Sequence, residues 1–531
     1  MNIAELIHRS VRRNPHHIAM TTGEASRSYG ELWDETARFA ALMARSGVRP
    51  GDRVLVYSEN RPEIFSIYLA AARLGAIFAP VHSTFKTMEL GYVLKNSQAQ
   101  ILFIEEGLAE QLDQGPSFQD LLPESVVILP PTGTTCQIID ECGPEVGIAQ
   151  VDADAPALIC YTSGSSSATP TPVTRSHDAE CWNAVTYADV WDINSWDSVL
   201  ISLPLSWVYG LSTVGLTALS MGATIVLQPA HGSEPLLPMI EKERVTVFAG
   251  TMTMYSRLLA ELQECMHDHS SLRRLYIGGE PVVLPVVRLV EHYTGIRPLQ
   301  AYATTEVAPV LAVDPVRDVA PPEGTAGRLV EGSEIRLVDA EGQDVPDGQV
   351  GEAWLRGNGA MLAYWNEPAL TASRRTTDGW YRSGDFMWRN PDGYYFLAGR
   401  DEDVVIRAGA KVAVIEVEAA IADVDGVDDV VVVAVPDEEF GEAVIAFVVL
   451  APGRSVSVDT IYDDLGKRIA RFKLPREICI LKEFPLGFTG KRDRRHLRRL
   501  AQSQQTPDGV VVTMADWLAK RSRGTGPRHL P

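Results

Sequence analysis

The stretch RVLVYSENRPEIFSIYLAAARLGAIFAPV (residues 53–81) decides the fold class, because hydrophobic patterns of two different periods follow one another within it. Arg53–Tyr57 and Ala76–Val81 are short apolar runs, which predict buried strands. Between them, Arg61–Leu74 carries apolar residues at helical spacing. A strand, a helix and a second strand in so short a span predict a crossover unit with two parallel strands.

The same alternation continues on both sides of this stretch. An amphipathic helix is predicted before it, over Glu31–Ser46. After it, the predicted elements are strands at Ala99–Ile104, Thr224–Gln228 and Val245–Ala249 and a helix at Leu236–Lys242. We expect Glu105–Gln150, which is rich in Gly, Pro and Gln, to be an irregular surface excursion. The pattern predicts an α/β fold with parallel-rich sheets.

The pattern changes after Val319, where short strands with turn residues predict a β-subdomain that completes a large N-terminal domain. Its predicted strands are Ile335–Val338, Gly348–Arg356 and Gly393–Leu397. Beyond Arg400 a compact α+β pattern predicts a small C-terminal domain. Its predicted elements are helices at Ile415–Ala422 and Val458–Ala470 and strands at Val430–Val435, Ala443–Leu450 and Glu477–Leu481. We therefore predict domains at residues 1–400 and 401–503, followed by a tail (504–531) with one candidate helix at Thr513–Lys520.

Bulk composition narrows the class of function. A chain of 531 residues is too long for one ordinary core, so at least two domains are expected. The 69 acidic against 48 basic residues give a net charge of -21, which argues against a nucleic-acid binder. Six scattered cysteines without a Cys-x-x-Cys pair predict neither a zinc site nor a disulfide framework. Without a secretory signal pattern or an apolar run of membrane-spanning length, we expect a cytoplasmic protein.

Two motifs have the chemistry of a nucleotide site. YTSGSSS (161–167) follows the strand-like run Ala157–Cys160, and such a Ser/Thr/Gly loop offers N–H groups and hydroxyls to phosphate oxygens. QAYATTE (300–306) has a ring able to stack on a base and, four residues later, a carboxylate able to hold Mg²⁺ beside phosphates. Each motif alone can also be read as ordinary structure, a solvated turn or a strand end.

Three further motifs lie nearer the C-terminus. YRSGD (381–385) puts an acid on a turn, where it can accept both ribose hydroxyls. GRDED (399–403) lies at the predicted domain boundary, and TGK (489–491) presents a lysine on a Gly-bearing loop. Each of these, too, can be read alone as a turn with charges.

In this order and spacing, the five motifs resemble those of the adenylate-forming superfamily. That superfamily includes acyl- and aryl-CoA ligases, peptide-synthetase adenylation domains and firefly-type luciferases. Further matches are RPGDRV (49–54), LPL (203–205), GGE (278–280), GE (351–352), VPD (435–437) and GE (441–442). The resemblance extends to about Leu500. It implies a ligase that forms an acyl thioester from a carboxylic acid, ATP with Mg²⁺ and CoA by way of an acyl-AMP.

The resemblance also assigns roles at the nucleotide. The matching nucleotide-binding residues are Thr162, Ser163, Gly164, Gly278, Gly279, Glu280, Tyr302, Thr305, Asp385 and Arg400. Tyr302 would stack on adenine, Asp385 would bind the ribose and Glu306 would reach Mg²⁺. Lys491 matches the catalytic lysine that bridges the carboxylate and the α-phosphate during adenylation. Its charge would offset that of an anionic carboxylate attacking an anionic phosphorus.

For the acid, the resemblance implies a pocket near Trp207, Tyr209, Gly210 and Ala303. Trp207 stands where many CoA ligases have a His, and core packing explains a tryptophan there equally well.

For CoA, the resemblance implies a mobile C-terminal domain that rotates between two orientations about a hinge at Glu402, where the family often has Asp or Lys. It also implies a catalytic small residue at Gly409 in the pantetheine tunnel. Phe472 offers a ring to the CoA adenine, and Lys473 and Arg476 offer cations to its 3′-phosphate. A strand-entry loop with surface charge explains this segment equally well.

The phosphate loop departs from the family pattern Thr-Ser-Gly-Thr-Thr-Gly-x-Pro-Lys-Gly. Ser167 replaces the middle Gly, Thr171 replaces the Lys and Pro172 replaces the last Gly, and the stretch to His177 is one residue longer. Proline has no N–H donor and a fixed φ, so it cannot replace that glycine. Because the losses fall on residues that hold the departing pyrophosphate, we expect weak or absent adenylation. Attack of CoA on a pre-formed acyl-AMP would remain, and a separate adenylating enzyme would supply that acyl-AMP.

Three alternatives stay open at this point. Ser hydroxyls and Mg²⁺ could compensate, so that both half-reactions run, and the retained Lys491 supports this. The chain could be a stand-alone adenylation enzyme that loads a separate carrier protein. It could also be a non-catalytic acyl-AMP binder. The sequence names neither the acid nor the oligomeric state.

Overall fold

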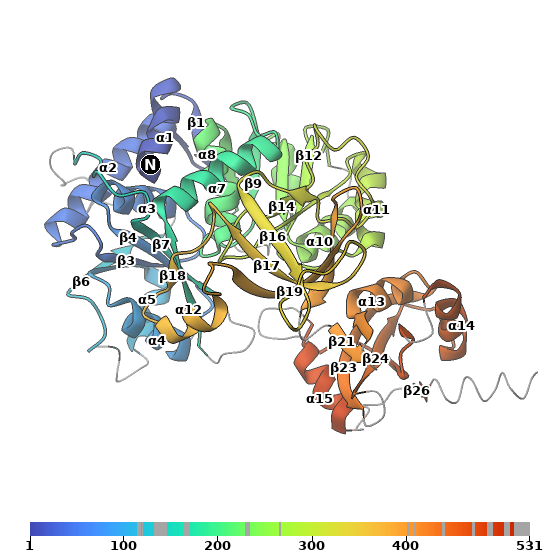
Figure 1. The fold of residues 1–531 in the computed structure, drawn as a ribbon. Coiled ribbons are helices and arrows are strands. Elements are labelled where there is room, and N and C mark those ends of the chain that lie inside the picture. Colours follow the sequence, from blue (N-terminus) through green and yellow to red (C-terminus); the bar gives the residue numbers. More distant parts are fainter. Residues whose placement is uncertain are drawn as a thin grey trace, which may run out of the picture. The chain divides into compact units, whose positions relative to one another are not determined.

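The computed structural model describes residues 1–85, 87–113, 118, 120–131, 146–162, 169–228, 234–264, 267–400, 404–407, 410–437, 441–469, 473–485, 492–503 and 510–513 (Figure 1). It divides into two compact units. Unit 1 comprises Met1–Val282, Val286–Ile335 and Trp354–Ser383, and unit 2 comprises Val283–Pro285, Arg336–Ala353 and Gly384–Pro531. The predicted class, α/β with a large N-terminal part and a smaller α+β C-terminal part, is confirmed.

The stretch that predicted the fold forms the centre of a seven-stranded sheet in the described part of unit 1. Its strands, in spatial order, are β18 (Ala363–Tyr364), β8 (Thr171–Ser176), β7 (Pro156–Thr162), β4 (Ile77–Val81), β3 (Arg53–Tyr57), β5 (Ile101–Glu105) and β6 (Ser125–Leu129). β3 and β4 are parallel and adjacent, as the crossover pattern predicts. All five residues of β4 are buried, as expected of a central parallel strand.

A nine-stranded sheet forms the other large layer of unit 1 within the described residues. Its order is β15 (Arg328–Leu329), β14 (Leu311–Ala312), β13 (Leu299–Tyr302), β12 (Arg274–Ile277), β11 (Val247–Gly250), β9 (Ser198–Ile201), β10 (Thr224–Leu227), β1 (Ile18–Thr21) and β2 (Ser26–Ser28). From β13 to β1 all neighbours are parallel. The carboxyl ends of these strands therefore meet at one edge, where ligands bind in α/β sheets.

Helices cover and join the two sheets. The described helices of unit 1 are α1 (Ile3–Arg13), α2 (Tyr29–Arg45), α3 (Glu63–Leu74), α4 (Thr87–Ser97), α5 (Glu106–Asp113), α7 (His177–Val190), η1 (Tyr209–Leu216), α8 (Thr217–Met221), α9 (Leu237–Lys242), α10 (Met252–Glu264), α11 (Leu284–Thr294) and α12 (Pro368–Arg374). Ser28 begins α2 with a capping box that Glu31 completes. α7 contacts β7, β8 and α8, and α8 contacts β10, so this helix pair lies between the two sheets (Figure 1).

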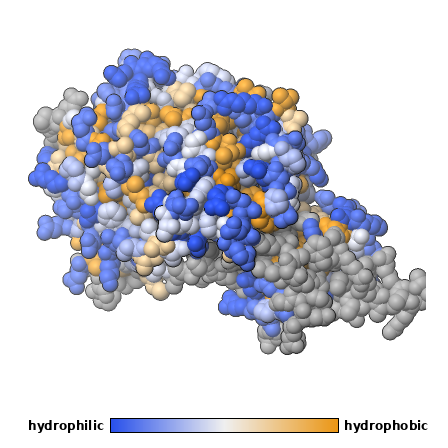
Figure 2. Space-filling view, viewed as in Figure 1, coloured by the Kyte–Doolittle hydropathy of each residue, from blue (hydrophilic) through white to orange (hydrophobic). Residues whose placement is uncertain are grey.

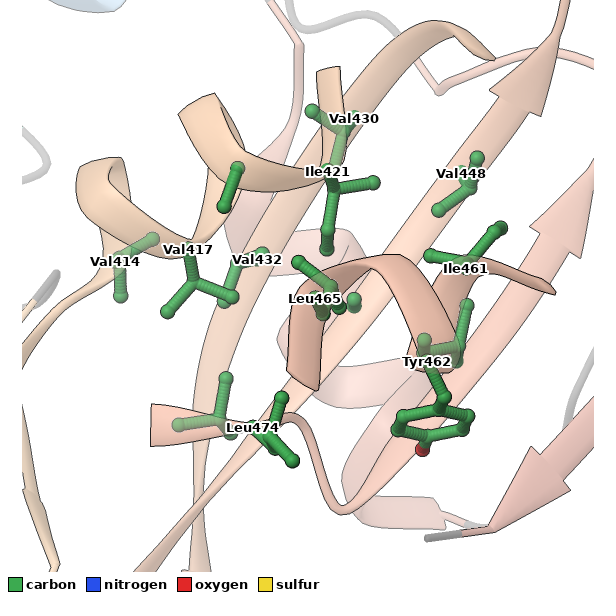
Figure 3. Close-up of a cluster of buried hydrophobic side chains, with 14 of the residues drawn as sticks. Val414, Val417, Ile421, Val430, Val432, Val448, Ile461, Tyr462, Leu465 and Leu474 are labelled. Carbon is green, nitrogen blue, oxygen red and sulfur yellow. The ribbon is translucent and has the colours of Figure 1, made fainter. Parts of the chain in front are cut away.

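A four-stranded sheet has the order β16 (Ser333–Val338), β17 (Gly351–Gly357), β19 (Tyr381–Arg389) and β20 (Tyr395–Arg400). The sheet of unit 2 has the order β22 (Ala410–Ala413), β21 (Val404–Arg407), β24 (Gly441–Leu450), β25 (Glu477–Leu481) and β26 (Val510–Thr513), and β23 (Val427–Asp437) also pairs with β24. Its helices are α13 (Val414–Ala422), α14 (Val458–Arg468) and α15 (Arg494–Ser503). Figure 3 shows Ile421 of α13 and Leu465 of α14 packed over Val432 and Val448 of the sheet, within one buried apolar cluster.

One sequence-based expectation was wrong. Glu105–Gln150 is not wholly irregular, since α5 and the edge strand β6 lie within it. The tail predicted at residues 504–531 includes a strand, since β26 pairs with β25. The candidate helix at Thr513–Lys520 begins in a strand at Thr513, and the rest lies outside the described residues. β6 and β26 each pair with a neighbouring strand of their sheet, β5 and β25 respectively.

The surface is consistent with an ordinary globular chain. On the face shown in Figure 2, hydrophilic residues predominate and hydrophobic ones lie in scattered groups. Among the described helices, none is long and apolar enough to cross a membrane.

Candidate active site

The predicted phosphate loop joins the two strands of a β-hairpin, β7 and β8. β7 and β8 are antiparallel, with Tyr161 opposite Pro172 and Thr162 opposite Thr171. Thr162 Oγ1 donates to the Thr171 carbonyl at 3.4 Å. β7 is thus longer than the predicted strand, and Thr171 and Pro172 belong to the second strand rather than to the loop. Residues 163–168, which include Ser163, Gly164 and Ser167, lie outside the described part of the chain.

Two predicted nucleotide segments lie at neighbouring strand ends. Gly278–Glu280 directly follow β12 and Ala303–Glu306 directly follow β13, and these strands are parallel neighbours. The carboxylate of Glu280 accepts hydrogen bonds from the backbone N and the hydroxyl of Thr253, at 2.8 and 3.0 Å. Tyr302 ends β13 and is 8% exposed. The two segments that the sequence assigned to the adenine therefore come together at one sheet edge.

Glu306 is held by the hydroxyl of a tyrosine that the sequence reasoning missed. Tyr364 Oη donates to Glu306 Oε1 at 2.8 Å. Burial, and then the negative charge of Glu306, raises the pKa of Tyr364, so its hydroxyl keeps the proton that it donates. Burial raises the pKa of Tyr381 as well, followed by the charge of Glu306. YRSGD (381–385) had pointed only to Asp385, because the contact with Glu306 crosses long sequence distances.

A single carboxylate at this place fits a nucleotide-bound Mg²⁺. Mg²⁺ is usually held by one or two carboxylates together with substrate phosphates rather than by an all-protein cage. Within the described residues, no group of three His, Cys, Asp or Glu forms a ready-made metal site. Glu306 is only partly buried, and its Oε1 accepts the hydrogen bond from Tyr364. If Mg²⁺ binds here, Glu306 would hold it together with the phosphates.

The predicted acyl pocket centres on a π-helix, η1. Its first residue, Tyr209, packs on the glycines after β12: a Cβ added to Gly278 would lie 3.2 Å from the Tyr209 ring. Tyr209 Oη donates to the carbonyl of Gly250 at 3.3 Å. A Cβ on Gly210 would lie only 2.6 Å from the carbonyl oxygen of Pro204, so the backbone approaches too closely for a side chain. π-Helical turns are rare and often occur at functional sites.

Trp207 lies next to an imidazole that the sequence reasoning did not select. The ring centroids of Trp207 and His82 are 5.9 Å apart. His82 Nδ1 lies 2.8 Å from Thr84 Oγ1 and accepts from the Thr84 backbone N at 3.3 Å. Ala303 follows Tyr302 at the end of β13. No sequence signal pointed to His82, because it follows a strand of the other large sheet, β4.

Unit 2 carries the remaining predicted residues. Asp385 on β19 is buried and stands opposite Arg400 of β20, whose side chain lies outside the description. Arg476 pairs with Asp437 Oδ2 at 2.9 Å and with Glu477 Oε1 at 3.0 Å, and Lys473 is partly exposed. The remaining predicted residues lie outside the described part of the chain; they are Glu402, Gly409, Phe472 and Lys491.

Two family models match the chain. The model of the AMP-binding enzyme matches residues 7–365, and that of the AMP-binding enzyme C-terminal domain matches residues 416–491. The first range contains YTSGSSS (161–167) and QAYATTE (300–306) and the second contains TGK (489–491), while YRSGD (381–385) and GRDED (399–403) lie between the two.

Individual proteins are similar over almost their whole length. An indoleacetate–CoA ligase of Aromatoleum aromaticum is 32% identical over 506 residues, covering 94% of this chain and 98% of the relative. A feruloyl-CoA synthase of an Amycolatopsis species is 32% identical over 492 residues, covering 92% and 97%. The crystal structure of ATP-bound MatB from Rhodopseudomonas palustris has a TM-score of 0.86 at 26% identity, covering 95% of this chain and 100% of MatB. The amide bond synthetase McbA of Marinactinospora thermotolerans has a TM-score of 0.83 at 26% identity, covering 94% and 100%.

Proposed function

The chain belongs to the AMP-binding enzyme family and is an AMP-forming acid–thiol ligase, and from this premise we propose that it acts mainly in the second half-reaction. In that step the CoA sulfur attacks the carbonyl carbon of a pre-formed acyl-AMP. The C–S bond forms, the bond from the acyl carbon to the phosphate oxygen breaks, AMP leaves and the thiol proton goes to solvent.

The observation that carries this proposal is the altered entry to β8. Thr171 and Pro172 are the first residues of a paired strand, where the family pattern has a lysine and a glycine. A threonine hydroxyl supplies no charge to a departing pyrophosphate, and a proline supplies no N–H. Loss of one preorganised donor typically costs about 10²–10³ in rate, and here several are missing.

In contrast to the phosphate loop, the residues that we assign to the acyl-AMP are retained. Tyr302 and Gly278–Glu280 share one sheet edge, and Glu306 has a tyrosine hydroxyl as partner. This set would bind the adenylate whichever enzyme had made it. ATP and Mg²⁺ are reactants of the first half-reaction, and Mg²⁺ would neutralise phosphate charge beside Glu306.

We further propose an aromatic acid as the substrate. Trp207 and Tyr209 supply rings at the predicted pocket, and His82 adds a third. Ligases named for indoleacetate and ferulate are each 32% identical to this chain. A flat ring packs well against such side chains in offset or edge-on contact.

The test compares the two half-reactions in the intact protein. Indole-3-acetic and ferulic acids, among a panel, are supplied either as acid with ATP and CoA or as synthetic acyl-AMP with CoA, and thioester is quantified by mass spectrometry. We expect the acyl-AMP route to be faster by about 10²-fold or more. Wild-type protein that forms acyl-AMP from ATP as fast as it consumes it would contradict the proposal. Acyl-AMP without any soluble thioester would favour the carrier-protein or the binder alternative.

A loop reconstruction supplies the matched variant. Ser167→Gly, Thr171→Lys and Pro172→Gly, with one residue deleted at Ala168 or Thr169, restore the family pattern. Pyrophosphate exchange should rise, and the second half-reaction should change by less than about twofold, since pyrophosphate takes no part in that step. No gain in exchange would mean that the loop is not the limiting part.

A further inference from the structure

A buried ion pair between Arg175 of β8 and Glu180 of α7 lies inside unit 1. Both side chains are 0% exposed, and Arg175 Nε donates to Glu180 Oε1 at 2.5 Å. Desolvation of each buried charge costs several kcal/mol, and well-packed apolar side chains often replace such a pair without loss of stability. Stability alone is therefore a weak reason for this pair, and its other contacts show what it holds.

Arg175 donates hydrogen bonds to the two backbone segments that meet at Glu306. Its Nη1 donates to the carbonyl of Thr305 and to that of Gly359, both at 3.0 Å. Thr305 directly precedes Glu306, and the backbone N of Met361 donates to the Glu306 carbonyl at 2.6 Å. One rigid guanidinium therefore ties together the two chain segments that meet at Glu306.

Glu180 extends the link to the predicted acyl pocket. Its Oε2 accepts a hydrogen bond from the Ser212 hydroxyl, and another from Tyr68 Oη at 3.0 Å. Ser212 lies in η1, the helix that begins with Tyr209 at the predicted pocket. Tyr68 lies in α3, outside both predicted binding segments. The same carboxylate oxygen thus joins one helix of the pocket and one helix of the scaffold.

We propose that Arg175 and Glu180 are positioning residues that fix the π-helix η1 relative to the Glu306 segment, and so align the acyl group with the nucleotide. The inference rests on the proposed function for the roles of those two segments. Catalytic rates are sensitive to such alignment, since a misplacement of 1 Å can cost about 10²-fold. A single buried linkage between the acid-binding and phosphate-binding segments would keep their spacing constant through both half-reactions.

The two hydroxyl donors of Glu180 give a matched pair of variants. Ser212→Ala and Tyr68→Phe each remove one donor from the same oxygen, but only Ser212→Ala releases η1 from the ion pair. We expect Ser212→Ala to slow thioester formation from indole-3-acetyl-AMP or feruloyl-AMP about tenfold, with the Kd for AMP alone changed less than about twofold. Tyr68→Phe should leave both quantities within about twofold. Comparable losses of turnover in the two variants, or no loss in Ser212→Ala, would overturn the proposal.

Arg175→Lys tests the other end of the link. The lysine keeps one positive charge but has a single nitrogen, whereas arginine reaches Glu180 through Nε and the two carbonyls through Nη1. It should lower kcat about tenfold or more and leave the KM for CoA unchanged. An unchanged kcat would count against the clamp, and if this variant does not fold, the Ser212 and Tyr68 comparison decides alone.

Failure of the proposed function is distinguishable from failure of this inference. If the wild type adenylates faster than it forms the thioester, the same comparison is made by pyrophosphate exchange. If neither half-reaction turns over, the ratio of Kd for AMP to Kd for acyl-AMP replaces the rate. Ser212→Ala should lower that ratio about tenfold and Tyr68→Phe should not, and equal ratios would again overturn the proposal.

Discussion

Adding one methyl group at Gly210 tests whether the start of η1 shapes the acyl pocket. In the structure the added Cβ would lie 2.6 Å from the carbonyl oxygen of Pro204 and 3.1 Å from Leu203 Cβ. Real Cβ atoms essentially never approach closer than 3.0 Å, so the backbone must move by at least 0.4 Å (3.0 minus 2.6). The obstacle is backbone rather than the tip of a flexible side chain, so η1 itself must shift.

The size of the effect follows from this displacement. Overpacking of this kind costs about 1–3 kcal/mol of stability. Tyr209 is displaced with the helix, and with it the ring that packs on Gly278. A misplacement of a few tenths of an ångström at the reacting groups should lower kcat/KM for acyl-AMP about tenfold, since 1 Å can cost about 10²-fold.

Gly215→Ala is the control on the same helix. Its added Cβ would lie 2.4 Å from Cζ of Phe65, a ring on α3, so it is overpacked to a similar degree. We expect both variants to lower the melting temperature, but only Gly210→Ala to lower kcat/KM for acyl-AMP plus CoA. A Gly210→Ala protein with reduced stability and wild-type kcat/KM would refute the pocket assignment. An equal loss of kcat/KM in both would show that η1 acts as a whole and that residue 210 has no special place.

Four further predictions concern other parts of the chain. Tyr364→Phe removes the hydroxyl that donates to Glu306 at 2.8 Å. Because a hydrogen bond to a charged group contributes about 1.5–3 kcal/mol, this variant should slow pyrophosphate exchange in the loop-rebuilt protein at least about tenfold. An unchanged exchange rate would show that Glu306 does not need this hydrogen bond. Burial lowers the pKa of His177 from 6.5 to about 4. As pH falls, the imidazole therefore takes up its proton at a higher pH in the unfolded chain than in the folded one. The free energy of unfolding should accordingly fall by about 3 kcal/mol between pH 7 and pH 4. Urea melts of His177→Asn should lack this part of the pH dependence, and a slope equal to the wild type would contradict it. Lys491→Ala should reduce pyrophosphate exchange far more than thioester formation from acyl-AMP, and equal losses would count against its adenylation role. Gly409→Leu should reduce thioester formation from acyl-AMP far more than pyrophosphate exchange, because the larger side chain blocks the pantetheine arm. Full thioester formation in this variant would contradict the assignment of Gly409 to the pantetheine tunnel.

The repeating parts of the fold could be predicted from the sequence because they depend on local periodicity. Arg53–Tyr57 is a strand with the predicted bounds, and the helix predicted at Glu31–Ser46 runs from Tyr29 to Arg45. The edge strands β6 and β26 were not predicted. Each is a run of only four or five residues that pairs with a neighbouring strand, β5 or β25, and no local pattern reveals those neighbours.

The candidate site shows the same division. Motifs on a single turn, such as the residues after β12 and β13, could be selected from the sequence and share one sheet edge in the structure. Partners contributed by distant segments could not: Arg175 reaches Thr305 across 130 positions and Gly359 across 184. An arginine in the run TPVTRSHD (171–178) carries no sign that its side chain will be fully buried against two carbonyls.

Under the proposed function, the place of the altered residues would explain how one half-reaction weakens while the other survives. Tyr302 and Gly278 are held by parallel strands inside a large sheet, where a change in one strand disturbs its neighbours. Thr171 and Pro172 lie where a hairpin loop enters β8, and the strand remains paired, with the Pro172 carbonyl accepting from Trp365 N at 2.8 Å. A loop can change without disturbing the scaffold that carries it. If the proposed function holds, substitutions there would remove charge and N–H donors from the pyrophosphate side, and the adenylate side would keep its geometry for a ligand made elsewhere.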